Sequence, residues 1–277
     1  GQYVATLDTP TAEISEVIRL MVGRTIYEEP KTKSMCPPDA PVVLEAEHLS
    51  SIDVKDVSFK LRKGEILGFA GLVGAGRTET MRLICGADPM DSGIIRVNGK
   101  DVKIRSPKDA VHYGIGYLSE DRKTYGLILT ETISKNISMA NLKRISKAGV
   151  LNLNKEIKET GENAKQFGVK CASIFQNAGN LSGGNQQKVV LAKWMFNLPD
   201  VLILDEPTRG IDVGAKYDIY CIINELAASG KCVLVISSEL PELLGVCDRI
   251  YVMNEGEIKG EKLVQDATQE NIMRLLI

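Results

Sequence analysis

The stretch G-L-V-G-A-G-R-T at residues 71–78 decides the fold class of this 277-residue chain. It follows the apolar run I-L-G-F-A (66–70) and fits the spacing G-x-x-x-x-G-K-[ST], with Arg77 where lysine is expected. Glycines in such a turn let backbone N–H groups surround phosphate oxygens at a helix N-terminus, and Thr78 can offer its hydroxyl to Mg²⁺. Taken alone, the segment also fits a glycine-rich turn that binds no ligand. The residues expected at the phosphates are Gly71, Gly74, Ala75, Gly76, Arg77, Thr78 and Glu79.

A second element closes another apolar run, where V-L-I-L-D-E (201–206) ends in two carboxylates. An acidic residue at the C-terminal end of a strand can reach a Mg²⁺ ion that is bound to phosphates, and we expect this role for Asp205. Glu206 is the candidate catalytic residue, because a carboxylate beside the metal can orient an attacking water. The alternative is a strand that ends in an acidic turn without a ligand.

The pattern of apolar residues predicts two kinds of strand. Continuous apolar runs at 66–70, 201–204 and 232–236 are typical of parallel strands that are covered on both faces. The segments 42–49 and 54–61 alternate apolar and polar residues, which predicts half-buried strands of an antiparallel layer. From about 121 to 180 the sequence is polar with a helical pattern. We therefore expect an α/β core with an inserted helical subdomain.

The first forty residues have a different character. Residues 12–22 show helical spacing of apolar side chains, and the following stretch holds prolines at positions 30, 37, 38 and 41, which predicts a linker. A shift of 255 positions lays V-I-R-L-M-V (17–22) on I-M-R-L-L-I (272–277). We interpret residues 1–25 as the tail of a preceding copy of the same module, 26–41 as a Pro-rich linker and 42–277 as one nucleotide-binding domain. Chance similarity between two amphipathic helices is the alternative.

Composition excludes several classes of function. The 34 Lys and Arg residues against 36 Asp and Glu residues give a net charge of −2, which disfavours nucleic-acid binding. The six cysteines form no C-x-x-C pair and the chain has only two histidines, so neither a zinc site nor a disulfide framework is expected. No apolar stretch approaches the length of a membrane-spanning helix, and the N-terminal sequence does not look like a secretion signal. We expect a protein that is neither secreted nor embedded in a membrane.

A third motif gives a family resemblance. Leu181-Ser182-Gly183-Gly184-Asn185-Gln186-Gln187 resembles the L-S-G-G-Q signature of ATP-binding cassette (ABC) ATPases, and it lies between the phosphate loop and the D-E strand as in that family. The resemblance covers residues 42–277. It implies an α/β fold with a P-loop NTPase core, an antiparallel β layer and an inserted α-helical subdomain. It also implies ATP and Mg²⁺ as cofactors, with Ser182, Gly183 and Gly184 directed at the γ-phosphate held by a partner cassette.

Within the family, the chain is most similar to the second cassette of tandem subunits of ribose, galactose and xylose importers. The motifs that carry this likeness are G-L-V-G-A-G-R-T-E, Y-L-S-E-D-R-K (117–123), L-S-G-G-N-Q-Q-K and V-I-S-S-E-L-P-E (235–242). The likeness implies an ATPase that energises monosaccharide import at the cytoplasmic face of a bacterial membrane. Its implied partners are the first cassette of the same polypeptide, an integral membrane permease and, indirectly, a sugar-binding protein.

The sequence departs from a fully active cassette at several positions. Arg77 replaces the loop lysine, and Glu120 stands where a glutamine normally touches Mg²⁺, so Glu120 joins Thr78 and Asp205 as a metal candidate. Ser238 occupies the place of the histidine that contacts the γ-phosphate; a helix N-cap is its alternative role. The region before Val54 also lacks the usual adenine-stacking aromatic. We therefore expect nucleotide binding with a weakened catalytic site.

Two rival functions remain at this point. One is a non-hydrolysing, nucleotide-dependent clamp that completes the active site of its partner cassette. The other is a cassette protein that acts on DNA or ribosomes, which would need a long coiled coil or basic arms that this sequence lacks. For the import function, the resemblance places the permease contact on the helical insert, with Tyr125, Leu127 and Ile128 as an apolar rim near Glu120.

Overall fold

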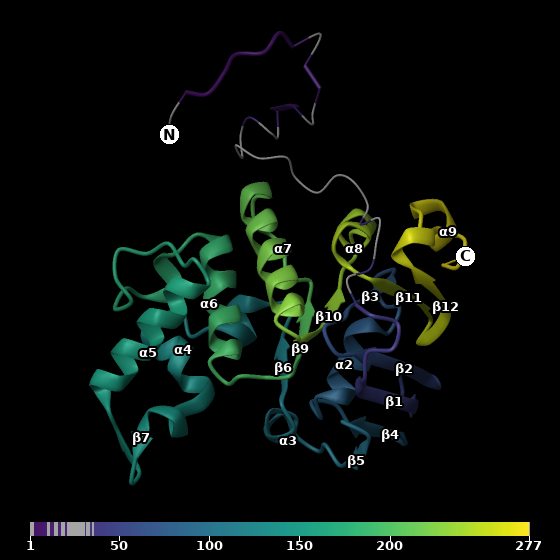
Figure 1. Ribbon diagram of the computed structural model, residues 1–277, viewed down its shortest axis with the longest axis horizontal. Helices are drawn as coiled ribbons and strands as arrows, with labels where there is room; N and C mark the ends of the chain where they lie inside the picture. The colour runs from purple at the N-terminus through teal and green to yellow at the C-terminus, as the bar shows by residue number, and fades with distance from the viewer. Residues whose placement is uncertain are drawn as a thin grey trace.

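The computed structural model describes residues 3–9, 12–13, 16–17, 20, 31, 34 and 36–276. The fold contains two main β-sheets (Figure 1). The larger sheet has the strand order β12-β11-β3-β10-β9-β6, and the smaller has the order β2-β1-β4-β5. The strands are β1 (Val42–Ser50), β2 (Val57–Arg62), β3 (Ile66–Gly71), β4 (Ser92–Val97), β5 (Lys100–Val102), β6 (Ile115–Leu118), β7 (Ser146–Lys147), β8 (Val150–Leu151), β9 (Val201–Asp205), β10 (Cys232–Ile236), β11 (Arg249–Asn254) and β12 (Glu257–Leu263).

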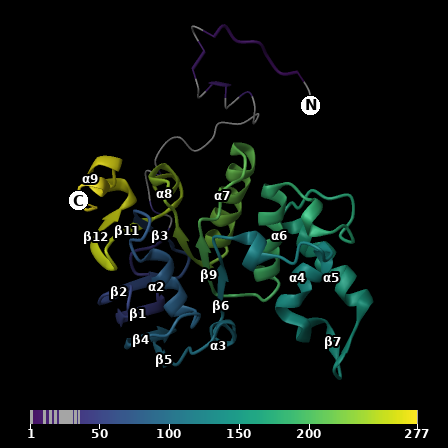
Figure 2. The ribbon, with the colours of Figure 1, turned by 180° about the vertical axis from the view of Figure 1, so that it is seen from behind.

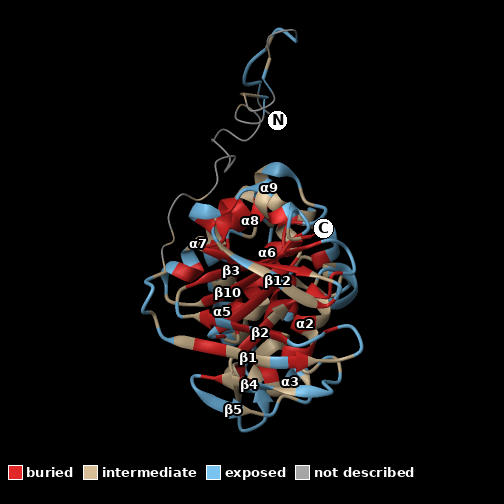
Figure 3. Ribbon diagram, turned by 90° about the vertical axis from the view of Figure 1, so that its right-hand side faces the viewer, coloured by how far each residue is buried: buried red, intermediate tan, exposed pale blue. Residues whose placement is uncertain are grey.

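The larger sheet confirms the prediction from the continuous apolar runs. Strands β3, β6, β9, β10 and β11 run parallel, and β12 joins β11 antiparallel. Alternate residues of β9 enter two different hydrophobic clusters: Leu202 and Leu204 pack with helices on one face, whereas Val201 and Ile203 pack toward the smaller sheet on the other. Both faces are therefore covered at the centre of the sheet, and Figure 3 shows β3 and β10 in the buried interior.

The smaller sheet is antiparallel, as the alternating segments predicted. Its second strand begins at Val57 rather than at position 54. The reason lies in the backbone of Asp56, whose φ of 53° belongs to the left-handed region and cannot continue a regular strand. Val54 is nevertheless fully buried, so the apolar pattern correctly marked a core position outside the strand.

The helices lie on both sides of the larger sheet. They are α2 (Arg77–Ile84), α3 (Pro107–His112), α4 (Ile133–Ser138), α5 (Leu153–Gln166), α6 (Gly183–Met195), α7 (Val213–Ala228), α8 (Leu240–Val246) and α9 (Gln269–Met273). A π-helical turn covers Arg122–Gly126, and 3₁₀ turns cover Met139–Ile145, Ala178–Asn180 and Val264–Asp266. Figures 1 and 2 show α4, α5 and α6 gathered at one end of the molecule, away from β1, β2 and α2.

The helical insert contains one feature that the sequence pattern did not predict. Strands β7 and β8 pair as a small antiparallel hairpin inside it. The connecting residues Ala148 and Gly149 have φ angles of 51° and 81°, which is the backbone conformation that a tight hairpin turn requires. The hairpin therefore depends on the turn residues rather than on an apolar pattern.

The chain before β1 contacts the core through Lys31. Its backbone N–H donates to the carbonyl of Leu244 at 2.8 Å, and its Nζ donates to the carbonyl of Val246 at 3.2 Å and lies 2.8 Å from Asp248. Most of the expected linker up to position 35 lies outside the described residues, as do Ile14, Ile18 and Met21 of the helix expected over 12–22. Within the described part of the chain, no helix combines the length and the apolar character needed to span a bilayer.

Candidate functional site

The site forms where parallel strands end at a common edge. Ile236 of β10 pairs with Phe69 of β3 on one side and with Asp205 of β9 on the other. The loops that follow these strands therefore start side by side, and they carry the phosphate loop (residues 71–78), the acidic pair and Ser238. This is the edge at which ligands bind in open α/β sheets.

The phosphate loop has the backbone that its glycines predict. Gly74 and Gly76 have φ angles of 81° and 92°, which a residue with a side chain rarely adopts. A Cβ on Gly71 would come within 2.7 Å of the Met253 carbonyl, and one on Gly76 within 2.9 Å of the Gly256 Cα. The loop leads directly into α2, with Gly76 at the N-cap and Arg77 as the first helical residue. The first N–H groups of a helix have no partner within the helix, and such a helix end can bind phosphate.

Asp205 lies beside the phosphate loop at the end of β9 and is fully buried. Its Oδ2 accepts a hydrogen bond from the Tyr117 hydroxyl at 2.9 Å, whereas its Oδ1 is buried without a hydrogen-bond partner among the described residues. Burial raises the pKa of Asp205 above its ordinary value, and hydrogen bonding from Tyr117 and Thr78 opposes this rise. A buried carboxylate oxygen that lacks a donor is suited to a cation.

These residues fit Mg²⁺ in the form in which it accompanies a nucleotide. Mg²⁺ commonly takes one or two carboxylates and completes its shell with waters and substrate phosphates. Thr78 and Asp205 supply such a partial set of oxygens. The described residues contain no group of three or more His, Cys, Asp or Glu side chains that could hold a metal, so phosphates would have to provide the remaining ligands.

Arg77, Glu206 and Ser238, three of the expected site residues, lie together at this edge. Arg77 Nη1 donates to the carbonyl of Ser237 at 2.6 Å and lies 3.8 Å from Glu206 Oε1. The same Oε1 accepts the backbone N–H of Ser238 at 2.7 Å. Burial lowers the pKa of Arg77, while Glu206 and Asp205 oppose the shift. In this arrangement the guanidinium that replaces the loop lysine is held by the segment that follows β10.

Ser238 is not the N-cap of α8, so its expected alternative role is wrong. The N-cap is Glu239, and its side chain caps no backbone group. The serine that accepts a backbone N–H here is Ser237, whose Oγ binds the N–H of Glu239 at 3.0 Å. Ser238 is exposed, because the Ser237 side chain takes the inward position. Its side chain remains a candidate for contact with a bound nucleotide.

Glu120 lies in the loop after β6 and forms an ion pair with Arg209, from the loop after the acidic pair. Both residues line a cavity of about 440 Å³ together with Asp121, Arg122 and Lys123. The described contact of Glu120 is thus with a cation rather than with Asp205. A role in metal binding would require this pair to open.

The signature residues lie at the start of α6, on the side of the helical insert. Ser182 is the N-cap, and its Oγ accepts a hydrogen bond from Asn185 Nδ2 at 2.9 Å. A Cβ on Gly184 would come within 2.3 Å of the Ala215 Cβ, so α6 and α7 can approach this closely only because Gly184 has no side chain. The contacts described for Ser182 and Gly184 do not include the phosphate loop of this chain, from which α6 is separated in Figures 1 and 2.

Of the three residues expected to form an apolar rim, two are exposed and one is buried. Tyr125 is 72% exposed and Ile128 is 48% exposed, whereas Leu127 is 6% exposed and packs in the hydrophobic core. Leu127 is buried because its place directly after the π-helical turn directs it toward α4 and α6. Tyr125 lines a cavity of about 200 Å³ whose wall includes Tyr117 and Trp194.

Sequence reasoning missed several residues that complete the site. Tyr117, Ser237, Thr208 and Glu242 all contact the expected residues or their neighbours. Tyr117 stands in the quoted motif Y-L-S-E-D-R-K, but no pattern within one sequence shows that its hydroxyl reaches a residue 88 positions away. The segment before Val54 contains no aromatic residue, and its Ile52 is 90% exposed.

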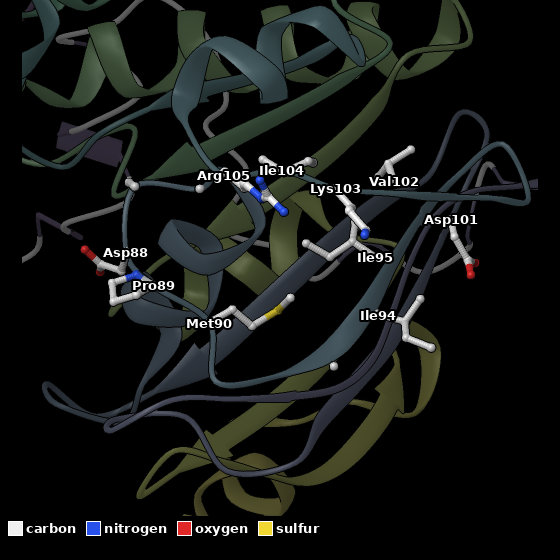
Figure 4. Close-up of a pocket in the computed structure, with 13 residues that line it drawn as sticks. Asp88, Pro89, Met90, Ile94, Ile95, Asp101, Val102, Lys103, Ile104 and Arg105 are labelled. Carbon is white, nitrogen blue, oxygen red and sulfur yellow. The ribbon is translucent and has the colours of Figure 1, made fainter.

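A separate cavity of about 730 Å³ lies on the antiparallel side of the molecule (Figure 4). Its wall is formed by the chain that follows α2 and by the segment from β5 to Arg105. None of the site residues expected from the sequence lines it. This cavity is therefore separate from the candidate site at the edge of the larger sheet.

Comparisons with known proteins agree with this geometry. A family model described as ABC transporter matches residues 54–209. A putative ribose/galactose/methyl galactoside import ATP-binding protein of Burkholderia lata is 49% identical over 99% of this chain and 54% of its own length. A ribose import ATP-binding protein of Lactococcus lactis is 49% identical over 99% of this chain and 56% of its own length. A xylose import ATP-binding protein of Thermoanaerobacter pseudethanolicus is 48% identical over 99% of this chain and 55% of its own length. The chain thus spans about half the length of these curated relatives.

Solved structures match the fold. An ATP-binding cassette of an ABC transporter in its ADP conformation aligns with a TM-score of 0.69 at 24% identity, over 85% of this chain and 94% of that chain. A dimeric cassette in a post-hydrolysis state with ADP and Pi aligns with a TM-score of 0.69 at 20% identity, over 80% of this chain and 98% of that chain. At these identities the structures show a shared cassette fold.

Proposed function

The chain belongs to the ABC transporter family, and we propose that it is an ATP-binding and ATP-hydrolysing cassette that energises import of a monosaccharide, of the ribose type, through a membrane permease. The observation that carries the nucleotide part is Asp205 Oδ1, which is buried without a hydrogen-bond partner within the described part of the chain. Asp205 lies beside Thr78, in a glycine loop that leads into a helix. The sugar-import part rests on the alignment of 99% of the chain with import ATP-binding proteins, at 48% to 49% sequence identity.

Each residue of the site has a distinct role in this proposal. The backbone N–H groups of Gly71, Gly74, Ala75 and Gly76 and the start of α2 receive the phosphates, with Arg77 and Glu79 at the helix start. Thr78 and Asp205 hold Mg²⁺, with Glu120 as a further candidate ligand. Bound Mg²⁺ supplies positive charge that neutralises the phosphates. Glu206 orients the attacking water, and Ser238 faces the γ-phosphate in place of a histidine.

The partner of this cassette in our proposal is a preceding cassette of the same polypeptide. The chain spans about half of its curated relatives, and the likeness between 17–22 and 272–277 supports two copies in tandem. Residues 1–25 would then belong to the first copy, 26–41 to the linker and 42–277 to this domain. Ser182, Gly183 and Gly184 start α6 away from this chain's own loop, which fits a signature that serves the ATP of the other copy.

The permease contact is proposed for the helical insert near Tyr125 and Ile128. Both side chains are exposed, and Tyr125 shares a cavity with Tyr117. Since Tyr117 also donates its hydroxyl to Asp205, this cavity is connected to the metal site by one side chain. Such a contact would place the chain as a peripheral subunit at the cytoplasmic face of a bacterial membrane, with a sugar-binding protein acting on the far side of the permease.

A non-hydrolysing clamp is the second candidate, and one observation favours it. Glu206 Oε1 is already engaged by the backbone N–H of Ser238 and lies 3.8 Å from Arg77, so the general base is held by protein groups. In that function the chain binds ATP and offers its signature to the partner site without turning over its own nucleotide.

Parallel binding and turnover assays on the chain separate the candidates. We expect the chain to bind Mg-ATP. Thr78→Ala should lose both ATP binding and its dependence on Mg²⁺. Phosphate release by the chain alone should be well below about 1 s⁻¹, since no partner signature is present in the assay. Absence of ATP binding would refute both candidates. In the tandem protein with its permease, hydrolysis at this site that is lost in Glu206→Gln supports the ATPase, whereas its absence supports the clamp.

A further inference from the structure

A buried carboxylate lies directly behind the nucleotide site. Glu242, in the first turn of α8, is 5% exposed. Its Oε1 accepts a hydrogen bond from Thr208 Oγ1 at 2.6 Å, and its Oε2 accepts one from Ser237 Oγ. The Tyr220 hydroxyl of α7 interacts with both Glu242 and Thr208. One carboxylate therefore joins the loop after β9, the segment after β10 and helix α7.

Burial of this carboxylate is unfavourable unless its hydrogen bonds are made. Burial raises the pKa of Glu242, and the hydrogen bonds from Ser237 and Thr208 act in the opposite direction. Both carboxylate oxygens are used by hydroxyl donors from different loops. Buried groups of this kind are costly when their partners are removed, so the arrangement holds both loops in one geometry.

Ser237 transmits this geometry to the nucleotide site. Its hydroxyl binds Glu242, while its carbonyl accepts Arg77 Nη1 at 2.6 Å. The next residue, Ser238, donates its N–H to Glu206 Oε1 at 2.7 Å. Thr208, on the other side of Glu242, follows Glu206 by two positions. Arg77 is thus held by a residue that Glu242 binds, and Glu206 is held by Ser238, the chain neighbour of that residue.

We propose that Glu242 is a positioning residue of the nucleotide site: its carboxylate holds Ser237 and Thr208 in place, and through them it directs Arg77 toward the phosphates and fixes Glu206. Glu242 touches neither nucleotide nor metal in this role. The inference rests on the proposed ATP binding of this cassette and adds a residue that acts from behind the site.

The direct test is Glu242→Gln, which keeps the size of the side chain but replaces one acceptor oxygen by a donor. We expect its dissociation constant for Mg-ATP, measured by calorimetry on the whole chain, to rise about tenfold, within the usual range of coupling between residues in contact. Glu239→Gln is the matched control, because Glu239 lies on the same segment but is exposed and pairs with Lys216. The control should change the constant less than about twofold.

A double-mutant cycle separates positioning from general stabilisation. If Glu242 acts through Arg77, Glu242→Gln should weaken ATP binding far less in an Arg77→Ala background than in the unaltered chain. Equal effects in both backgrounds, or unchanged ATP binding in Glu242→Gln, would overturn the inference. Thermal unfolding of each variant verifies that it is folded.

Smaller changes cover the case in which Glu242→Gln does not fold. Ser237→Ala and Thr208→Val each remove one hydroxyl donor while Glu242 stays in place, and each should weaken ATP binding by about threefold or more. Unchanged binding in both overturns the inference. Failure of the unaltered chain to bind ATP would instead refute the proposed function itself, so the two failures are distinguishable.

Discussion

The hydroxyl of Tyr117 donates a 2.9 Å hydrogen bond to Asp205 Oδ2, and Tyr117 also lines the cavity that reaches Tyr125. The two residues come from adjacent parallel strands, β6 and β9, in which Tyr117 pairs with Ile203. A side chain that lines this cavity therefore also sets the environment of the proposed Mg²⁺ ligand.

Tyr117→Phe should weaken Mg²⁺-dependent ATP binding. The hydroxyl lowers the pKa of Asp205, which burial already raises, so its removal raises that pKa further and the carboxylate becomes protonated at higher pH. A Mg²⁺ titration at two pH values should show a loss of about tenfold that grows as the pH falls, as expected for a hydrogen bond to a charged group. Tyr113→Phe, which removes a nearby tyrosine hydroxyl, is the control; equal Mg²⁺ requirements in both variants would contradict the prediction.

The signature and the general base should differ in importance. In the tandem protein, Ser182→Arg should abolish transport, because a large cation at the N-terminus of α6 opposes the helix dipole and blocks closure on the partner's ATP. Glu206→Gln should cause a milder loss, since it affects only the site already altered at Arg77 and Ser238. Sugar uptake in cells measures both. Equal damage from the two variants, at equal expression, would mean that this cassette's own site hydrolyses ATP.

The proposed permease contact can be tested at two exposed side chains. Tyr125→Asp and Ile128→Asp should each reduce co-purification with the permease and sugar uptake, because a charge in an apolar contact is costly to bury. Leu153→Asp is a suitable control, since Leu153 is 64% exposed but lies on the other part of the helical insert. Leu127→Asp is unsuitable, because it would place a charge in the core. Full assembly of both variants would exclude this surface.

Lys31 should contribute to stability although it precedes the first strand, β1. Its Nζ lies 2.8 Å from Asp248, which is 2% exposed on its side chain, and Lys31 also binds two carbonyls at the end of α8. Lys31→Ala should lower the free energy of unfolding by about 2 kcal/mol, between the values for exposed and buried pairs. Chemical denaturation measures the change. Lys63→Ala, at an exposed position, should have little effect; equal stability of the two variants would refute the contribution.

Local sequence patterns were sufficient for the main features of the architecture. The continuous apolar run at 201–204 predicts a strand that is buried on both faces. The structure confirms this, because Leu202 and Ile203 pack in different hydrophobic clusters. The glycines at 74 and 76 predict their own backbone, since their positive φ angles exclude most other residues. These conclusions depend on interactions within a few residues of chain, and a single sequence displays them directly.

Only the tertiary structure decided how distant side chains combine. Arg77 meets Ser237 across 160 positions, Glu242 meets Thr208 across 34, and Glu120 meets Arg209 instead of the acidic pair. The burial of Leu127 and the inward position of Ser237 rather than Ser238 belong to the same class. Such contacts depend on the register of neighbouring parallel strands and on the exit direction of each loop, which involve the whole sheet. No local pattern contains that information, and so the sequence alone determined which residues gather at the sheet edge, while the packed sheet determined which of them touch.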